Sequence, residues 1–396
     1  PWRENSLAEP EVYLVVALSG RALALAVRRS GRRPVVLDLF GDADMRAGAE
    51  ESLVVDGDFD NGFEEAALLA AAERLAPGAS PPVYGLAYSS GFESRPDVLT
   101  KLACGRRLYG NAPETIARTK DPRIFFRLLD RLSIPYPEVS YTLPPDPSGW
   151  LMKRIGGSGG GHVESARTGA APGSACYFQR RTSGRSVGVS FLADGRSAFL
   201  LGLSEQWSSP RPGSESYRFG GLLQPADISR CISDALPAML DALVLELRLV
   251  GLNSLDLIVD GDAFYVLEVN PRPGANLDIF DGGDPIGLFG LHVAACDGRL
   301  PRQWTPPPKA TAMAVLYADR PLQAPMQVAW ADWVADRPAP GATIEAGAPI
   351  CTVLAAEPSR DAVRQAIAAR TAVVFAQLRD ADGHGMSAAG QGDDRR

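Results

Sequence analysis

The feature that most restricts the fold is a short turn sequence between two apolar segments late in the chain. Leu255–Val259 and Phe264–Val269 are apolar and β-prone, and Asp260-Gly261-Asp262 separates them. An Asp-Gly pair between two such segments is a strong signal for a tight hairpin. We therefore expect two antiparallel strands here, with side chains alternating between the two faces of a sheet.

Three polar residues on this hairpin suggest a metal site. Asp256 lies on the first strand, and Glu268 and Asn270 lie on the second. Alternation puts Glu268 and Asn270 on one face, and pairing across the turn brings Asp256 near them. Such oxygen ligands suit magnesium that bridges ATP phosphates and keeps several waters. An acidic, solvated strand face is the alternative, although Asn is a poor strand former with no propensity reason to occur there.

A lysine followed by a glycine-rich loop forms a second candidate group. The segment Trp150–Ile155 carries Lys153 and runs directly into this loop. The loop consists of Gly156, Gly157, Ser158, Gly159, Gly160 and Gly161. Exposed backbone N–H groups in such a loop can wrap phosphate oxygens, while the ammonium offsets their charge. A glycine-rich surface turn is the alternative for such a run taken alone.

The first hundred or so residues predict a parallel α/β unit. Val12–Leu18 and Pro34–Phe40 are apolar runs joined by a helix-like stretch, and Val83–Tyr88 is a third run that ends in Ser89-Ser90-Gly91. This order is typical of a βαβ opening whose strand ends meet at one edge of the sheet. Loops at that edge are placed to help hold a substrate.

The expected fold class combines α/β and α+β parts. Residues 1–110 are expected to form the N-terminal parallel α/β domain, 111–301 the main body, and 302–380 a small C-terminal α+β region. A long amphipathic helix is expected from Pro225 or Asp227 to about Leu249, and another helix near Arg360–Leu378. Residues 381–396 are rich in Gly, Asp and Ser and are expected to form a flexible tail.

Composition argues against several other classes of protein. The net charge of -7, with scattered arginines, argues against nucleic-acid binding as the main role. The longest apolar stretch, Leu236–Leu252, is interrupted by charges and is too polar to span a bilayer. No secretory signal is visible at Pro1–Pro10, and the five cysteines lack metal-site spacing. We therefore expect reduced, mostly buried thiols in a cytoplasmic protein.

Taken in order, these motifs resemble the ATP-grasp superfamily. The resemblance covers about Asn111–Pro301 and begins with Asn-Ala-Pro-Glu, followed by Lys120 and a helix that ends at Ile134-Pro135-Tyr136-Pro137. Tyr177–Arg181 is similar to the hinge that reads adenine in this superfamily. The other matching positions are Lys153, Asp256, Glu268, Asn270 and Arg272. Their order and spacing make the combination specific.

The resemblance implies a role for each position. Lys120 and Lys153 would contact ATP phosphates, and the loop 156–161 would close over them. Arg272 would steady the transferring phosphoryl group or the acyl phosphate. The residues implied to hold adenine and ribose are Gln179, Arg180, Arg181 and Thr182. The implied ligands of magnesium, or of manganese in its place, are Asp256, Glu268 and Asn270.

The implied activity is that of an ATP-dependent carboxylate–amine ligase working through an acyl phosphate. Its substrates would be a small-molecule carboxylate and an amine, for example glutamate joined to a metabolite or cofactor precursor. Branches such as tyramine–glutamate and pterin–glutamate ligases of one-carbon cofactor synthesis look closest, and a homodimer is a further expectation. A carboxylase or purine-synthesis enzyme is an open alternative, as is a non-catalytic nucleotide-binding regulatory protein.

Two departures from the family pattern concern the adenine hinge. Gln179-Arg180-Arg181 stands where an acidic pair is common, and no ribose-binding acid is evident around Gly184–Val187.

Two histidines receive simpler interpretations. His162, after the glycine loop, is interpreted as a polar loop residue, and His292 as a core or interface residue.

Overall fold

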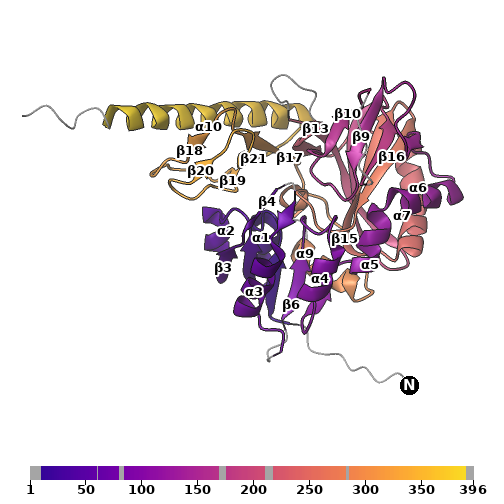
Figure 1. Ribbon diagram of the computed structural model, residues 1–396, viewed down its shortest axis with the longest axis horizontal. Helices are drawn as coiled ribbons and strands as arrows, with labels where there is room; N and C mark the ends of the chain where they lie inside the picture. The colour runs from indigo at the N-terminus through magenta and orange to yellow at the C-terminus, as the bar shows by residue number, and fades with distance from the viewer. Residues whose placement is uncertain are drawn as a thin grey trace, which may run out of the picture.

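The computed structural model describes residues 10–59, 61–79, 84–168, 175–209, 217–281 and 285–388. An N-terminal α/β domain lies beside a larger body, and a long C-terminal helix lies along the C-terminal strands (Figure 1). The N-terminal sheet is parallel, with strand order β3-β2-β1-β6-β7. Its strands are β1 (Val12–Val16), β2 (Arg33–Asp38), β3 (Glu51–Val54), β6 (Gly85–Tyr88) and β7 (Arg107–Tyr109).

The helices of this domain confirm the predicted parallel α/β unit. Their bounds are α1 (Arg21–Arg29), α2 (Ala43–Gly48), α3 (Glu65–Leu75) and α4 (Pro96–Leu102), and a small hairpin pairs β4 (Gly57–Asp58) with β5 (Gly62–Phe63). The strand β1 is apolar throughout and almost wholly buried, as expected for a parallel strand covered on both faces. Loops after β1, β2 and β6 therefore lie at one edge of this sheet.

The body begins with two short helices and a four-stranded antiparallel sheet. The helices are α5 (Pro113–Lys120) and α6 (Pro122–Arg131). The sheet has the order β10-β9-β11-β8. Its strands are β8 (Val139–Ser140), β9 (Trp150–Arg154), β10 (Val163–Ser165) and β11 (Cys176–Arg180). The glycine loop joins β9 to β10.

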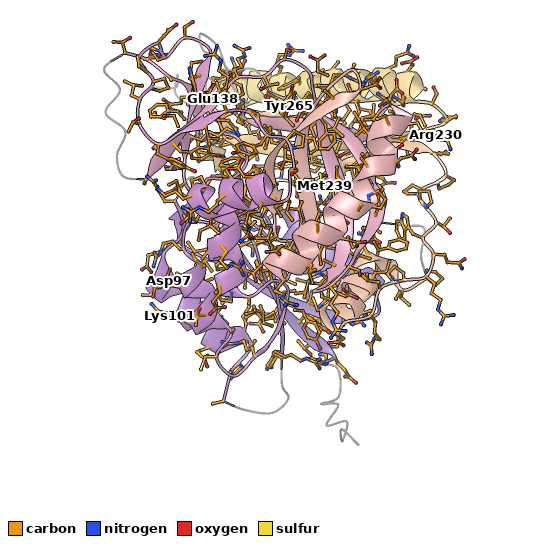
Figure 2. The ribbon with its side chains drawn as sticks, turned by 90° about the vertical axis from the view of Figure 1, so that its right-hand side faces the viewer. Asp97, Lys101, Glu138, Arg230, Met239 and Tyr265 are labelled. Atoms are coloured by element: carbon orange, nitrogen blue, oxygen red, sulfur yellow. The ribbon has the colours of Figure 1, made fainter. Side chains whose placement is uncertain are left out.

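A larger antiparallel sheet forms the other wall of the body. Its order is β16-β15-β12-β13-β14-β17-β21-β19. The body's own strands are β12 (Arg185–Asp194), β13 (Ala198–Ser208), β14 (Phe219–Gln224), β15 (Val250–Asp260) and β16 (Ala263–Asn270). The predicted hairpin of β15 and β16 is confirmed. Helix α7 (Arg230–Leu247) lies over this sheet, with Arg230 at its start and Met239 midway (Figure 2).

Helix α7 begins slightly later than predicted. The Ser229 hydroxyl accepts a hydrogen bond from the Ile232 N–H at 3.4 Å and caps the helix, which therefore starts at Arg230 rather than near Pro225 or Asp227. Between α6, α7 and the large sheet lies an apolar core that includes Phe126, Phe191 and Leu240. This core holds β12 and β15 in place, and therefore also the polar residues on their opposite face.

The C-terminal strands continue the large sheet rather than forming a separate sheet. β17 (Ala310–Tyr317) pairs with β14, and β21 (Pro349–Glu357) and β19 (Val334–Ala335) follow. The boundary expected at residue 302 is therefore crossed by sheet hydrogen bonds. A two-stranded sheet pairs β18 (Leu322–Gln323) with β20 (Thr343–Ile344). Helix α10 (Arg360–Ala388) packs on β17 and β21.

Helix α10 extends past the predicted end near Leu378 and includes residues 381–388, which were expected to belong to the tail. Residues 389–396 lie outside the described residues. Two short helices, α8 (Leu277–Phe280) and α9 (Gly287–Cys296), connect the body to the N-terminal domain, because both contact α1. Among the described residues, no helix is long and apolar enough to cross a membrane.

The cysteines differ from the expectation of mostly buried thiols. All five are free, but Cys104 and Cys231 are exposed and only Cys351 is fully buried.

The interpretation of His292 as a core residue is confirmed. Its Nδ1 accepts a hydrogen bond from the Leu252 N–H at 2.8 Å, and its Nε2 lies 3.1 Å from the Tyr109 carbonyl oxygen. Burial lowers the pKa of His292 to about 4, so the ring is neutral.

Candidate functional site

The three polar residues of the hairpin lie together, as predicted. Asp256 is directly opposite Glu268, and the Asn270 Nδ2 donates to Asp256 Oδ2 at 2.9 Å. Gln206 Nε2 donates to Asp256 Oδ1 at 3.1 Å. Lys120 Nζ donates to Glu268 Oε2 at 2.8 Å and to Asn270 Oδ1 at 3.0 Å. Two carboxylates, two amides and one ammonium therefore form a continuous polar cluster.

A β-bulge places Glu268 on the correct face. Leu257 pairs with Val266, and simple alternation from that pair would put Leu267 opposite Asp256. The register shifts between Asp256 and Leu257, so Glu268 takes that position instead. A bulge inserts one extra residue and re-aims the side chains that follow it. The convergence predicted from alternation thus depends on an irregularity that alternation does not predict.

Burial and charge act in opposite directions on the two carboxyl groups. Burial, and then Glu268, raise the pKa of Asp256 above its ordinary value. Burial would also raise the pKa of Glu268, but the Lys120 ammonium and the neighbouring His162 and Lys153 lower it below its ordinary value. The two carboxyl groups therefore favour a nearby cation, and the Lys120 ammonium supplies one beside Glu268.

These residues also fit a hard divalent cation. Magnesium prefers oxygen ligands, and Asp256, Glu268 and the Asn270 amide supply them from adjacent strands. Among the described residues no group of three His, Cys, Asp or Glu side chains has metal-binding geometry. A metal at this position would therefore depend on two carboxylates, the amide, and oxygen atoms from the nucleotide or water.

Local sequence explains how the two lysines reach the cluster. Pro122 keeps Asp121 in an extended conformation, so α5 ends at Lys120 and its ammonium faces Glu268. Lys153 lies on β9, opposite Tyr177 of β11. Its ammonium has no hydrogen-bond partner within the described residues, and burial lowers its pKa, although nearby Glu268 and Asp256 oppose that shift. An anion placed between the lysines would meet both.

The glycine loop depends on glycine at particular positions. Gly156 and Gly160 have φ values of 72° and 75°. A Cβ on Gly160 would lie 1.9 Å from the Tyr217 carbonyl oxygen, and one on Gly156 would lie 2.7 Å from Ser94 Cα. The Gly159 carbonyl accepts a hydrogen bond from the Phe219 N–H at 2.9 Å. The loop therefore rests against both the large sheet and the N-terminal domain.

The cavity between the two sheets has a volume of about 560 Å³. Ser158, Gly159 and Gly160 line it, whereas Gly156 and Gly157 line a smaller hollow beside Lys120. Gly161 lines neither. His162 is half-buried and lines both hollows, with its Nδ1 3.3 Å from the Ser158 carbonyl oxygen. The structure thus places His162 at the cavity wall, rather than leaving it only a polar loop residue.

The predicted hinge forms one end of this cavity. Gln179 is 1% exposed, and its Nε2 has no hydrogen-bond partner among the described residues. The Arg180 guanidinium lies 5.6 Å from the centre of the Trp150 ring. Residues lining this end are Leu151, Tyr177, Gln179, Arg180, Arg181, Thr182, Ile258 and Leu267. An unsatisfied buried donor between apolar side chains suits a planar heterocycle with acceptor nitrogens.

Arg272 also lines the cavity, and the residue that holds it was not predicted. Arg272 Nε donates to Glu93, which is 6% exposed and lies in the loop between β6 and α4. The same carboxylate accepts the Gly91 and Phe92 N–H groups at 2.9 and 3.0 Å. Burial would raise the pKa of Glu93, but Arg272 and Lys120 lower it. The only sequence signal was its place after the strand end at Ser89-Ser90-Gly91.

Comparison with known proteins gives the family of this arrangement. Residues 120–276 match the sequence profile of the ATP-grasp domain family. The carbamoyl phosphate synthase large chain of Acidobacterium capsulatum is 26% identical over 224 residues, which cover 51% of this chain and 20% of that protein. The chain therefore spans about a fifth of that relative's length.

Solved structures share the fold at low sequence identity. One is the biotin carboxylase domain dimer of 2-oxoglutarate carboxylase from Hydrogenobacter thermophilus, in complex with MgADP, ADP and bicarbonate. The match covers 90% of this chain and 88% of that one, at 12% identity and a TM-score of 0.66. Another is N5-carboxyaminoimidazole ribonucleotide synthetase from Thermus thermophilus. That match covers 90% of this chain and 96% of the other, at 20% identity and a TM-score of 0.64.

The ordered motifs, the profile match over the strands that carry the polar cluster, and the shared two-sheet fold agree with one another. Residues 120–276 are therefore an ATP-grasp domain, and the fold of the chain is shared with these solved structures.

Proposed function

We propose that this protein is an ATP-dependent ligase that activates a carboxylate as an acyl phosphate and joins it to an amine. The observation that carries the proposal is that Lys153, Asp256 and Glu268 line one cavity beneath the glycine loop, while Lys120 reaches Glu268 from the smaller hollow beside it. A polyphosphate needs cationic side chains, and its metal needs carboxylates. Both kinds of group are present at one place.

Each part of the cavity would then bind a different part of the substrates. The hinge, with the unsatisfied Gln179 amide, takes adenine, and Lys153 and the glycine-loop N–H groups take the phosphates. Asp256, Glu268 and Asn270 would hold magnesium, which supplies charge neutralisation for phosphoryl transfer when bound. Arg272 lies where it can orient the substrate carboxylate, with Glu93 fixing its guanidinium.

The reaction requires alignment rather than a protein nucleophile. A carboxylate oxygen attacks the γ-phosphorus and ADP leaves, giving an acyl phosphate. The neutral amine nitrogen then attacks the acyl carbon, phosphate leaves, and the nitrogen loses a proton as the amide forms. The two lysines and Arg272 offset the charge that moves between these oxygens.

A carboxylase is the second candidate, and two of the related proteins support it. These are the carbamoyl phosphate synthase and the biotin carboxylase domain, the latter with bound bicarbonate. In a carboxylase, bicarbonate would take the place of the organic acid at the same nucleotide site. The ligase proposal includes glutamate as the amino acid that is joined. It also includes a homodimer, for which the Hydrogenobacter domain dimer is a precedent.

A coupled assay for ADP release separates the two candidates. The purified chain is given Mg-ATP with a matrix of carboxylates and amines, and in parallel with bicarbonate and the same amines. ADP release that needs both an organic carboxylate and an amine supports the ligase, and hydroxylamine in place of the amine should then give an acyl hydroxamate. Release that depends on bicarbonate supports the carboxylase, and the absence of ADP release under every condition would contradict both.

A further inference from the structure

The cavity that Arg272 lines also has three aspartates in its wall. Asp42 follows β2, Asp278 is the second residue of α8, and Asp336 follows β19, and all three line the cavity. Asp38 and Asp44 lie behind them. We call these five residues the acidic end. Three parts of the chain that are far apart in sequence supply it, because α8 and the C-terminal strands pack against the edge of the N-terminal sheet.

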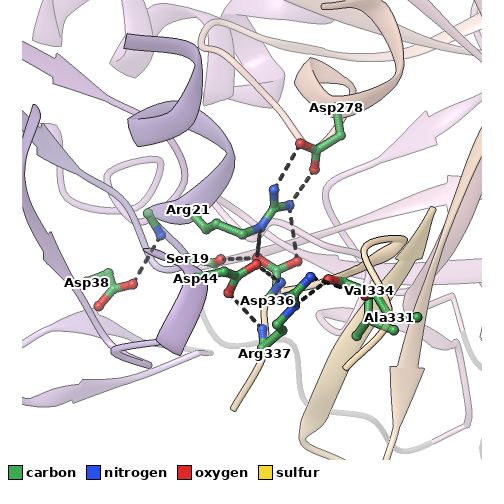
Figure 3. A network of polar contacts seen from close by, with 10 residues as sticks. Ser19, Arg21, Asp38, Asp44, Asp278, Ala331, Val334, Asp336 and Arg337 are labelled. Atoms are coloured by element: carbon green, nitrogen blue, oxygen red, sulfur yellow. Dashed lines mark hydrogen bonds and ion pairs between the residues drawn. The ribbon is translucent and has the colours of Figure 1, made fainter. Parts of the chain in front are cut away.

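Arg21 is the central cation of the acidic end (Figure 3). It is 3% exposed, its Nη1 donates to Asp278 Oδ1 at 3.0 Å, and its Nε donates to Asp336 Oδ1 at 2.7 Å. Asp44 accepts the backbone N–H groups of Asp336 and Arg337 at 3.0 and 2.9 Å. These three carboxylates are therefore satisfied within the protein.

Two further arginines nearby have other partners. Arg46 Nε donates to the Gly41 carbonyl at 2.8 Å, and Arg337 Nε donates to the Val334 carbonyl at 2.8 Å. Asp38 accepts the Gly20 and Gly41 N–H groups at 3.3 and 3.0 Å. Among the described residues, Arg21 is therefore the arginine that forms ion pairs with these aspartates, and the five carboxyl groups outnumber the three arginines around them.

Asp42 is the exception in this network. It is 7% exposed and lines the cavity, yet its carboxylate has no hydrogen bond or ion pair among the described residues. Burial, followed by Asp336 and Asp38, raises its pKa to about 9. A buried carboxylate without a partner is costly, so its retention at a cavity wall needs a reason. A donor from a bound molecule would provide one.

We propose that the acidic end binds a cationic amine of the second substrate, with Asp42 as its direct partner. The neighbouring wall is apolar and indicates what carries the amine. The side chains that line it are Phe40, Phe219, Leu222, Met313, Val315 and Tyr317. The ligand class is therefore an ammonium group on an apolar body. The proposal rests on the proposed function for the nucleotide end, since it names the amine substrate of the same cavity.

The test compares probes of equal size and different charge. Hexylamine and 2-phenylethylamine are compared with 1-hexanol and hexanoate by ligand-observed NMR and calorimetry, on the full chain with a non-hydrolysable Mg-ATP analogue. The variants are Asp42→Asn, which keeps shape and removes the charge, and Asp319→Asn, which removes an exposed aspartate outside the cavity. Melting curves confirm that both variants are folded.

We expect an amine to bind the wild type at least about tenfold more tightly than its alcohol, and to lose at least that factor in Asp42→Asn only. Equal binding of alcohol and amine, equal amine affinity in Asp42→Asn, or no amine binding at millimolar concentration would each overturn the proposal. Affinity for the Mg-ATP analogue is measured separately. If the wild type does not bind the Mg-ATP analogue but still binds amines through Asp42, the proposed function fails, whereas the amine site at the acidic end stands.

Discussion

The two ends of the cavity differ in how their buried charged groups are balanced. At the nucleotide end, Glu268 and Asp256 are balanced by Lys120 and by Lys153, whose ammonium has no partner among the described residues. At the acidic end, Arg21 is bound on both sides and Asp42 is left over. One end therefore has an ammonium group without a hydrogen-bond partner among the described residues, and the other has a carboxyl group without one. The difference indicates an anionic ligand at the first end and a cationic ligand at the second.

The ends also differ in how much of the fold depends on them. The cluster at the nucleotide end lies on one hairpin and the helix beside it, whose positions are set by an apolar core on the opposite face. Arg21 instead joins residues that are 257 and 315 positions away. Changes at the first end should reduce activity, whereas changes to Arg21 should reduce stability.

The largest effect is expected from Glu268→Gln. This change keeps the size of the side chain and removes one metal-facing charge, so turnover should fall on the order of 100-fold or more, the scale of losing one electrostatic contact to a transition state. Folding should survive, because the Gln oxygen still accepts from Lys120. Steady-state ADP release measures the effect, and Asp262→Asn at the exposed hairpin turn is the control. Near-normal turnover at low magnesium would refute the metal assignment.

Arg21→Met should have the next largest effect, and on stability. Removing the guanidinium leaves the buried Asp278 and the half-buried Asp336 without their shared partner, and such a loss costs about 3–5 kcal/mol where the pair is fully buried. Urea unfolding measures the loss. Arg33→Met removes an exposed pair with Glu50 and should cost much less. Similar losses for the two variants would mean that Arg21 does not join the domains as described.

Sequence predicted the nucleotide end far better than the acidic end, and the reason is distance along the chain. The Asp260-Gly261-Asp262 turn and the strands beside it predicted the approach of Asp256 and Asn270, which are 14 residues apart. The bulge that brings Glu268 to the same face was not predictable from alternation. Nothing local to Arg21 or Asp42 indicated Asp336, because that contact forms only when the C-terminal strands extend the large sheet.

Lys153→Ala tests the end of the cavity that is proposed to hold the nucleotide, and it should affect ligand affinity rather than stability. The ammonium lies at the cavity without a hydrogen-bond partner in the described part of the chain, so its removal should cost little stability. ATP affinity should fall by about tenfold to a hundredfold, since a charge-assisted phosphate contact is lost. Calorimetry with Mg-ATP measures this, and Lys309→Ala, at an exposed position, is the control. Unchanged affinity would remove Lys153 from the phosphate site.

The last prediction, and the one most specific to the acidic end, is the pH dependence of Asp42→Asn. The pKa of Asp42 in the folded protein is raised to about 9 from an ordinary 3.8, by burial and by the neighbouring Asp336, Asp38 and Asp44, while Arg21 opposes the shift. A carboxyl with a raised folded pKa holds its proton more tightly when folded. It therefore costs little at about pH 4 and destabilises the fold increasingly as the pH rises toward 9.

Asparagine does not titrate, so Asp42→Asn should be more stable than the wild type at about pH 8, and this advantage should shrink toward about pH 5. Urea unfolding at the two pH values measures this, and the difference between Asp319→Asn and the wild type should not show that trend. A variant less stable than the wild type at the higher pH would mean that Asp42 has a partner within the fold. Added amine should reverse the order, because only the wild type then gains an ion pair, and this reversal would tie the stability defect to the ligand that relieves it.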